Sequence, residues 1–170
     1  MRLAAALCVL AAIAGPASAE DEIGSTGGPR AADKGTFGIG IILGEPTGIS
    51  AKLYLKDDQA LQAGLGFAFI GDGLHAHVDY VFHPLILQER DSFVLPVYVG
   101  PGVRMINYER GRGNHVFTLG LRAVAGLLFD FKTVPLDAFV EVAGVVEFGF
   151  SDDEGFGLTL NAAAGARYYF

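Results

Sequence analysis

The segment LHAHVDYVFH, residues 74–83, places four side chains that can ligate a metal or transfer a proton at even spacing. His75, His77, Asp79 and His83 share one parity, so on an extended strand they point to the same face. Such a row could hold a metal ion, or a general base beside a carboxylate that orients it. One strand supplies only one wall of a site. We therefore expect a hydrogen-bonded interior row, with no catalytic residue, no metal and no other cofactor.

Further charged residues share a face with small and polar residues elsewhere in the chain. If that face is internal, its charges must be paired, because an isolated buried ion costs several kcal/mol. The expected lumen charge network is Lys52, His75, His77, Asp79, Arg104, Arg122, Glu141, Glu147 and Arg167. Its four bases nearly balance its three acids, which favours a closed and plugged lumen.

The elements that must carry these residues are eight apolar stretches separated by short clusters of Gly, Asp, Asn and Pro, which favour hairpin turns and loops. The stretches are 36–43, 47–55, 60–69, 74–83, 93–108, 116–131, 137–150 and 158–170. Within them the hydrophobic period is two, which is the signature of strands with two different faces. No stretch outside the N-terminal 19 residues is long and apolar enough for a transmembrane helix.

The sense of this alternation separates a soluble barrel from a membrane barrel. A soluble barrel points its apolar face inward and covers its outer face with charges. Here the non-apolar face is rich in glycine, which suits a narrow interior; these glycines are Gly64, Gly66, Gly100, Gly102, Gly120, Gly126 and Gly165. The pattern therefore predicts an all-β, eight-stranded, antiparallel up-and-down transmembrane β-barrel over residues 36–170, with apolar side chains facing lipid.

Two local features qualify the strand pattern. LGEPTGISAK, beginning at Leu43, has the Gly-x-Pro-x-Gly spacing of a tight hairpin connection, although its glycines could also shape a binding loop near Lys52. Pro101 falls in the middle of a predicted strand and cannot donate a ladder hydrogen bond. A bulge at Gly100–Gly102 would accommodate it, and we expect a local break there.

The N-terminal residues predict the compartment. Residues 1–19 combine Arg2, an apolar core and an Ala-Ser-Ala site, which is typical of a cleaved secretory signal peptide. Residues 20–35 read as a flexible leader of no chemical specificity. Removal of the signal takes the single cysteine, Cys8, with it, and leaves 11 − 19 = −8 formal charges. That acidic balance argues against nucleic acid as a partner.

The signal, the eight alternating stretches and the terminal GARYYF together resemble the small eight-stranded outer-membrane β-barrels of gram-negative bacteria, the class of OmpX, OmpW and the OmpA membrane domain. The resemblance implies a monomer in outer-membrane lipid, inserted by the barrel-assembly machinery through a C-terminal signal. Gly165, Tyr168 and Phe170 match that signal, whereas Ala163 stands where a polar residue is expected. The resemblance also places KDDQ, PLILQERDS and KTVPL on the periplasmic side.

The function expected from these features is structural, or the handling of a small apolar ligand, without an open pore. An eight-stranded barrel is just wide enough for its own side chains. Three alternatives remain open at this point: an outer-membrane lipid-modifying enzyme, a narrow channel, and a soluble periplasmic lipocalin-like binding barrel. No serine lies two residues from a histidine, so nucleophilic hydrolysis has no specific support.

Overall fold

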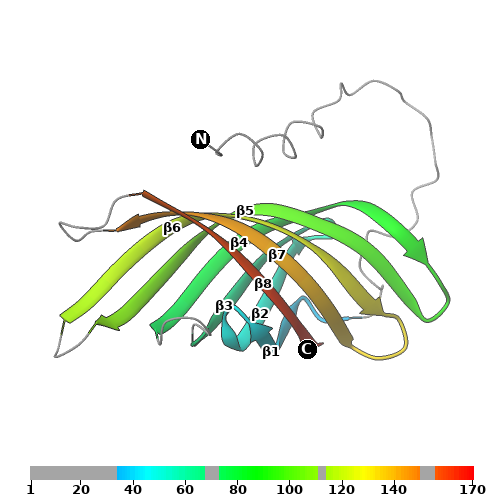
Figure 1. Ribbon diagram of the computed structural model, residues 1–170. Coiled ribbons are helices and arrows are strands. Elements are labelled where there is room, and N and C mark those ends of the chain that lie inside the picture. Colours follow the sequence, from blue (N-terminus) through cyan, green and yellow to red (C-terminus); the bar gives the residue numbers. More distant parts are fainter. Residues whose placement is uncertain (1–33, 68–72, 111–113, 150–155) are drawn as a thin grey trace, which may run out of the picture.

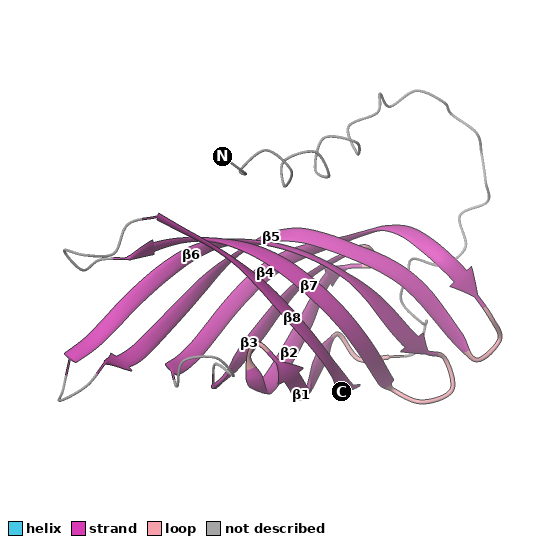
Figure 2. Ribbon diagram, viewed as in Figure 1, coloured by secondary structure: helices cyan, strands magenta, loops and turns pink. Residues whose placement is uncertain are grey.

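The protein is an all-β closed barrel in this computed structural model, which describes residues 34–67, 73–110, 114–149 and 156–170 (Figures 1 and 2). Eight strands follow one another around the wall. Their bounds are β1 Phe37–Gly44, β2 Thr47–Lys56, β3 Gln59–Phe67, β4 Gly73–Glu89, β5 Phe93–Arg110, β6 Asn114–Phe131, β7 Leu136–Gly149 and β8 Phe156–Tyr169. The predicted signal peptide and most of the predicted leader lie outside the described residues.

Each strand pairs antiparallel with its neighbours in sequence, and β1 also pairs with β8 through Ile39 and Tyr168. Closure removes the exposed strand edges that an open sheet would leave. We call first rim the end where β1 meets β2 and β7 meets β8, and second rim the end where β2 meets β3 and where β1 begins. The predicted eight-stranded up-and-down topology is confirmed.

Side chains alternate between the interior and the outer wall along the strands, except after His83 in β4, where most residues are exposed. In β6, Leu119 and Leu121 are exposed, whereas Arg122 and the residues of its parity are buried. The sense of the alternation is the predicted one, with charged groups inside and apolar groups outside.

Glycines on the inner face make room for the interior rings. A Cβ placed on Gly64 would lie 2.3 Å from Cε1 of His77, and one on Gly126 would lie 2.4 Å from Cζ of Tyr98. Real Cβ contacts are longer, so a side chain at either position would displace the ring. The glycine-rich inner face therefore follows from the size of the interior rather than from backbone flexibility.

The predicted connector PLILQERDS is mostly strand. β4 continues to Glu89 and pairs with β5 there, so the connector contains only Arg90–Ser92. Pro84 was the reason to expect a loop, because it lacks the donor that a ladder needs. The structure accommodates it with a register shift between Phe82 and Leu85, beyond the last pair of β4 with β3. The apolar residues that follow Pro84 resume the pairing.

The break expected at Pro101 is smaller than predicted. β5 runs unbroken through Pro101, which pairs with Ala123 of β6 in constant register. On the other side, the pairing with β4 is interrupted between Gly102 and Val99 without a change of register. The missing N–H of Pro101 therefore costs pairing on one side only, and the bulge expected at Gly100–Gly102 is wrong.

The leader ends in an ordered contact. Lys34 is 7% exposed, although residues 20–35 were expected to be flexible and without chemical specificity. Its Nζ pairs with Asp130 and donates to the carbonyl of Leu136. This contact could not be predicted from the sequence pattern, because the partner lies 96 residues further along the chain.

Candidate functional site

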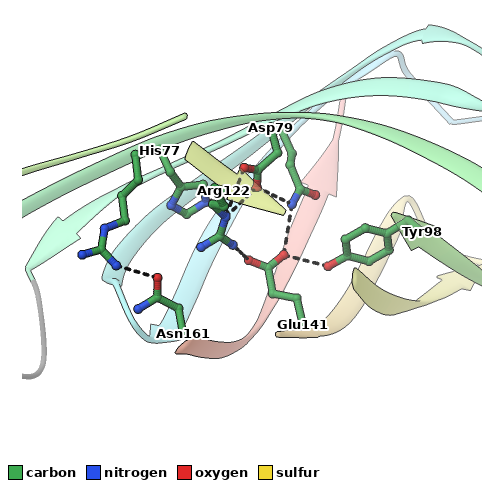
Figure 3. A network of polar contacts seen from close by, with 8 residues as sticks. His77, Asp79, Tyr98, Arg122, Glu141 and Asn161 are labelled. Carbon is green, nitrogen blue, oxygen red and sulfur yellow. Dashed lines mark hydrogen bonds and ion pairs between the residues drawn. The ribbon is translucent and has the colours of Figure 1, made fainter. Parts of the chain in front are cut away.

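The centre of the barrel holds a guanidinium between two carboxylates (Figure 3). Arg122 of β6 donates from Nε to Asp79 Oδ2 at 3.1 Å and from Nη2 to Glu141 Oε1 at 2.6 Å. Gln62 of β3 bridges the same two carboxylates, and Tyr98 of β5 donates its hydroxyl to Glu141 Oε2 at 2.7 Å. Charge-assisted bonds of this kind are the strong ones in a low-dielectric interior. Five strands are therefore tied together through one cluster.

A second group lies nearer the first rim. Arg104 of β5 donates from Nη1 to Asn161 Oδ1 at 2.8 Å and pairs through Nη2 with Glu147. Thr159 donates its hydroxyl to the same carboxylate at 2.7 Å. This cation is thus held by both β7 and β8.

A third group closes the interior toward the second rim. Arg167 donates from Nε to Asp137 Oδ1 at 3.0 Å, and Tyr169 donates its hydroxyl to the other oxygen at 2.6 Å. The guanidinium of Arg167 also lies over the ring of Phe139, 4.1 Å from its centroid, which is a cation–π distance. Lys34 and Asp130 complete the group.

Lys52 lies between the central cluster and the third group, without a carboxylate in direct contact among its described partners. Its Nζ is 2.9 Å from His83 Nε2 and lies over the rings of Tyr54 and Tyr98, 4.8 and 5.2 Å from their centroids. The other nitrogen of His83 is 3.1 Å from the carbonyl oxygen of Asp58. Both nitrogens of His83 are therefore engaged.

The remaining histidines of the row lie closer to the first rim. His75 Nδ1 is 3.4 Å from Oε1 of Glu45, in the β1–β2 connector, and His77 Nε2 is 3.9 Å from Asp79 Oδ2. The two rings meet edge to face with centroids 5.5 Å apart. The connector itself is the predicted tight hairpin, in which Thr47 Oγ1 donates to the carbonyl of Gly44 at 3.0 Å.

All nine residues of the predicted lumen network point inward, and only Glu147 among them is partly exposed. Sequence reasoning missed partners that complete the network. They are Lys34, Glu45, Gln62, Tyr98, Asp130, Asp137, Asn161 and Tyr169. Parity alone would have found Asp137, since it lies an even number of residues before Glu141 on the same strand.

The completed set of interior charges is nearly balanced. Among the described residues, five inward cations face five inward carboxylates, and Glu45 in the first-rim connector adds a sixth. The cations are Lys34, Lys52, Arg104, Arg122 and Arg167, and the carboxylates are Asp79, Asp130, Asp137, Glu141 and Glu147. Each of these cations except Lys52 forms an ion pair with at least one of these carboxylates.

One group in the interior has the composition of a metal site. Ligand atoms of His77, Asp79 and Glu141 lie within 4.8 Å of one another and are buried. Arg122 bonds both carboxylates, however, and so already supplies the positive charge that a cation would bring there. This group by itself is an ion-pair cluster.

The outer wall is apolar on every strand. Its large exposed side chains include Ile41, Ile49, Leu65, Val78, Val103, Leu121, Val142 and Leu160, one from each strand. Among the residues whose burial is described, the exposed charged side chains gather at the second rim. They are Lys56, Asp57, Asp58, Glu89, Arg90, Asp91 and Lys132.

Exposed aromatic rings lie toward both ends of this apolar wall. Phe67, Phe117 and Phe148 lie toward the first rim, and Phe37 and Phe129 lie toward the second. The predicted insertion residues belong to the same wall. Tyr168 is 46% and Phe170 71% exposed, whereas Gly165 faces inward beneath the ring of Phe139. The expected orientation of Tyr168 and Phe170 is therefore confirmed, while their role in insertion stays a prediction.

Comparison with known proteins finds no matching family model, no similar curated protein and no similar solved structure. The part of the chain that the structure describes contains no helix long and apolar enough to cross a membrane.

Proposed function

We propose that this protein is an integral outer-membrane β-barrel whose lumen is filled by its own side chains and forms no open pore. Its role is then structural, or the handling of a small apolar ligand at the membrane. The observation that carries the proposal is the inverted wall: apolar side chains cover the outside on all eight strands, and the charged network lies inside. The soluble lipocalin-like alternative requires the opposite arrangement.

The extent of the apolar wall favours lipid over water. Soluble monomers seldom expose contiguous apolar patches larger than a few hundred Å², whereas here the exposed apolar residues continue around the barrel. Aromatic residues at the two ends match the girdles that membrane barrels place at the interfaces. Strands of about 9–11 residues cross a bilayer when tilted, and β2 and β3 have 10 and 9 residues.

The filled interior supports the absence of a pore. Lys52, His75, Asp79, Tyr98 and Arg167 are each at most 1% exposed, although they lie at different depths in the barrel. Barrels that conduct through a water-filled lumen are wider and have more than eight strands. Folded protein in planar bilayers should therefore show no single-channel conductance steps; reproducible steps would favour the narrow-channel alternative.

Membrane fractionation tests the proposal directly. The protein should be recovered with the outer membrane, should need detergent for extraction, and should migrate differently on gels before and after heating because the folded barrel resists unfolding. Recovery as a detergent-free soluble protein would overturn the membrane assignment and favour the lipocalin-like barrel.

A further inference from the structure

His75 and His77 of β4 each have one ring nitrogen without a hydrogen-bond partner. His75 is 0% and His77 4% exposed, yet His75 Nε2 and His77 Nδ1 contact no donor or acceptor in the described part of the chain. A buried polar atom that loses its hydrogen bond to water and gains none in return is destabilising. Two such atoms on adjacent inward residues point to a ligand that is not part of the chain.

The second nitrogen of each ring faces a carboxylate. His75 Nδ1 is 3.4 Å from Glu45 Oε1, and His77 Nε2 is 3.9 Å from Asp79 Oδ2. In metal sites a carboxylate hydrogen-bonded to one nitrogen sets the ring position and the tautomer that leaves the other nitrogen available. Glu45 is within hydrogen-bond distance of His75, whereas Asp79 lies beyond that distance from His77. His83 provides the contrast on the same face of the same strand, since both of its nitrogens are engaged.

The two rings are close enough to serve one ion. Two bonds of about 2.1 Å from zinc to nitrogen allow the ligating nitrogens to lie up to about 4 Å apart. The ring centroids of His75 and His77 are 5.5 Å apart at an interplanar angle of 71°. At that separation of the rings, a small change of their side-chain torsions would bring one nitrogen of each ring to a single ion.

The cations nearest the two histidines are each paired with carboxylates. Arg122 is neutralised by Asp79 and Glu141, and Arg104 pairs with Glu147. Three carboxylates thus face two guanidinium groups around the histidines. Because Arg122 occupies the side of Asp79 and Glu141, an added cation belongs on the other side of the rings, toward the first rim.

The two histidines lie toward the first rim of the barrel. His75 lies two residues from Gly73, where β4 begins at the first rim. Glu45 reaches it from the β1–β2 connector at the same rim. Neutral imidazole nitrogens suit borderline divalent ions such as Zn²⁺, whereas Mg²⁺ and Ca²⁺ prefer oxygen ligands.

We propose that His75 Nε2 and His77 Nδ1 bind one borderline divalent transition-metal ion at the first-rim end of the lumen, with Glu45 orienting the ring of His75. The proposed metal site rests only on contacts inside the barrel and does not depend on the proposed membrane location.

Zinc binding by the untagged folded protein in detergent micelles tests the site, because a histidine tag would itself bind the ion. Equilibrium dialysis should give one Zn²⁺ per chain and no comparable uptake of Mg²⁺. His75→Ala and His77→Ala should each weaken zinc binding by about 10-fold or more, as should Glu45→Gln to a smaller extent. The matched control His83→Gln should bind zinc as the unsubstituted protein does.

Imidazole ¹H–¹⁵N spectra give a second readout that needs no substitution and so does not depend on the variants folding. The chain has four histidines, and Zn²⁺ should shift Nε2 of His75 and Nδ1 of His77 selectively. The proposal would be overturned by absence of zinc uptake, or by shifts confined to the other two histidines. It would also be overturned if the His75→Ala and His77→Ala variants bound zinc as tightly as the unsubstituted protein.

Discussion

Arg122 and Asp79 lie 43 residues apart in sequence and meet in the centre of the barrel, where Nε of the arginine donates to Oδ2 of the aspartate at 3.1 Å. Both side chains are almost completely buried. Because the same guanidinium also bonds Glu141, one residue neutralises two acids that come from different strands. This arrangement makes the interior sensitive to single substitutions.

Replacing Arg122 by Met should destabilise the barrel by about 3–5 kcal/mol, because it leaves two buried carboxylates without their cation. Urea unfolding of the protein in lipid vesicles measures the loss. Leu121→Met is the matched control, since the neighbouring side chain faces outward and the change conserves volume. Equal stability of R122M and the unsubstituted protein would show that the ion pairs contribute nothing.

Gly64→Ala should lower the free energy of unfolding by about 1–3 kcal/mol, the usual cost of overpacking a tight interior. The added Cβ would lie 2.3 Å from Cε1 of His77 and must displace the ring. Gly144→Ala is the control, because a Cβ there meets nothing within 4 Å. The same urea titration compares the two variants. If Gly64→Ala and Gly144→Ala have the same free energy of unfolding, the inner glycines are not required to make room for the interior rings.

Leu121→Arg should destabilise the barrel by about 2–4 kcal/mol if the outer wall lies in a bilayer, because a charge at the midplane loses its hydration. Leu121 is 60% exposed and lies near the middle of β6. The same change at Val134, which is 42% exposed in the connector at the second rim, should cost about 1 kcal/mol or less. In a soluble barrel both substitutions would be nearly neutral, so the difference between them reports on the surroundings of the wall.

Phe170→Ala should reduce the fraction of protein that reaches the heat-modifiable folded form in cells. The substitution removes the exposed terminal ring but retains the backbone bond from Phe170 N to the Phe37 carbonyl oxygen, 2.9 Å long. Phe148→Ala, at the opposite end of the barrel, serves as a control for the loss of an exposed aromatic. Normal assembly of F170A would contradict a role of the terminal aromatic in insertion.

Strand order, strand parity and the inverted wall could all be predicted from the sequence, as the inward positions of Asp79, Arg122 and Glu141 illustrate. Each of these follows from a local property, the alternation of side chains along a strand. The errors occurred where prolines interrupt the pattern. At Pro84 and Pro101 the missing donor suggested a loop or a bulge, but pairing with the neighbouring strands carried β4 and β5 through.

The sequence by itself determined which side chains enter the lumen, because parity needs no knowledge of other strands. Only the tertiary structure decided which of them meet. Lys34 reaches Asp130 across 96 residues and Gln62 reaches Glu141 across 79, and these pairings depend on barrel closure and strand register. The same closure engaged both nitrogens of His83 while leaving one on His75 and one on His77 without a partner. The side chains of the row His75, His77, Asp79 and His83 therefore differ in their bonding because different strands and connectors face them.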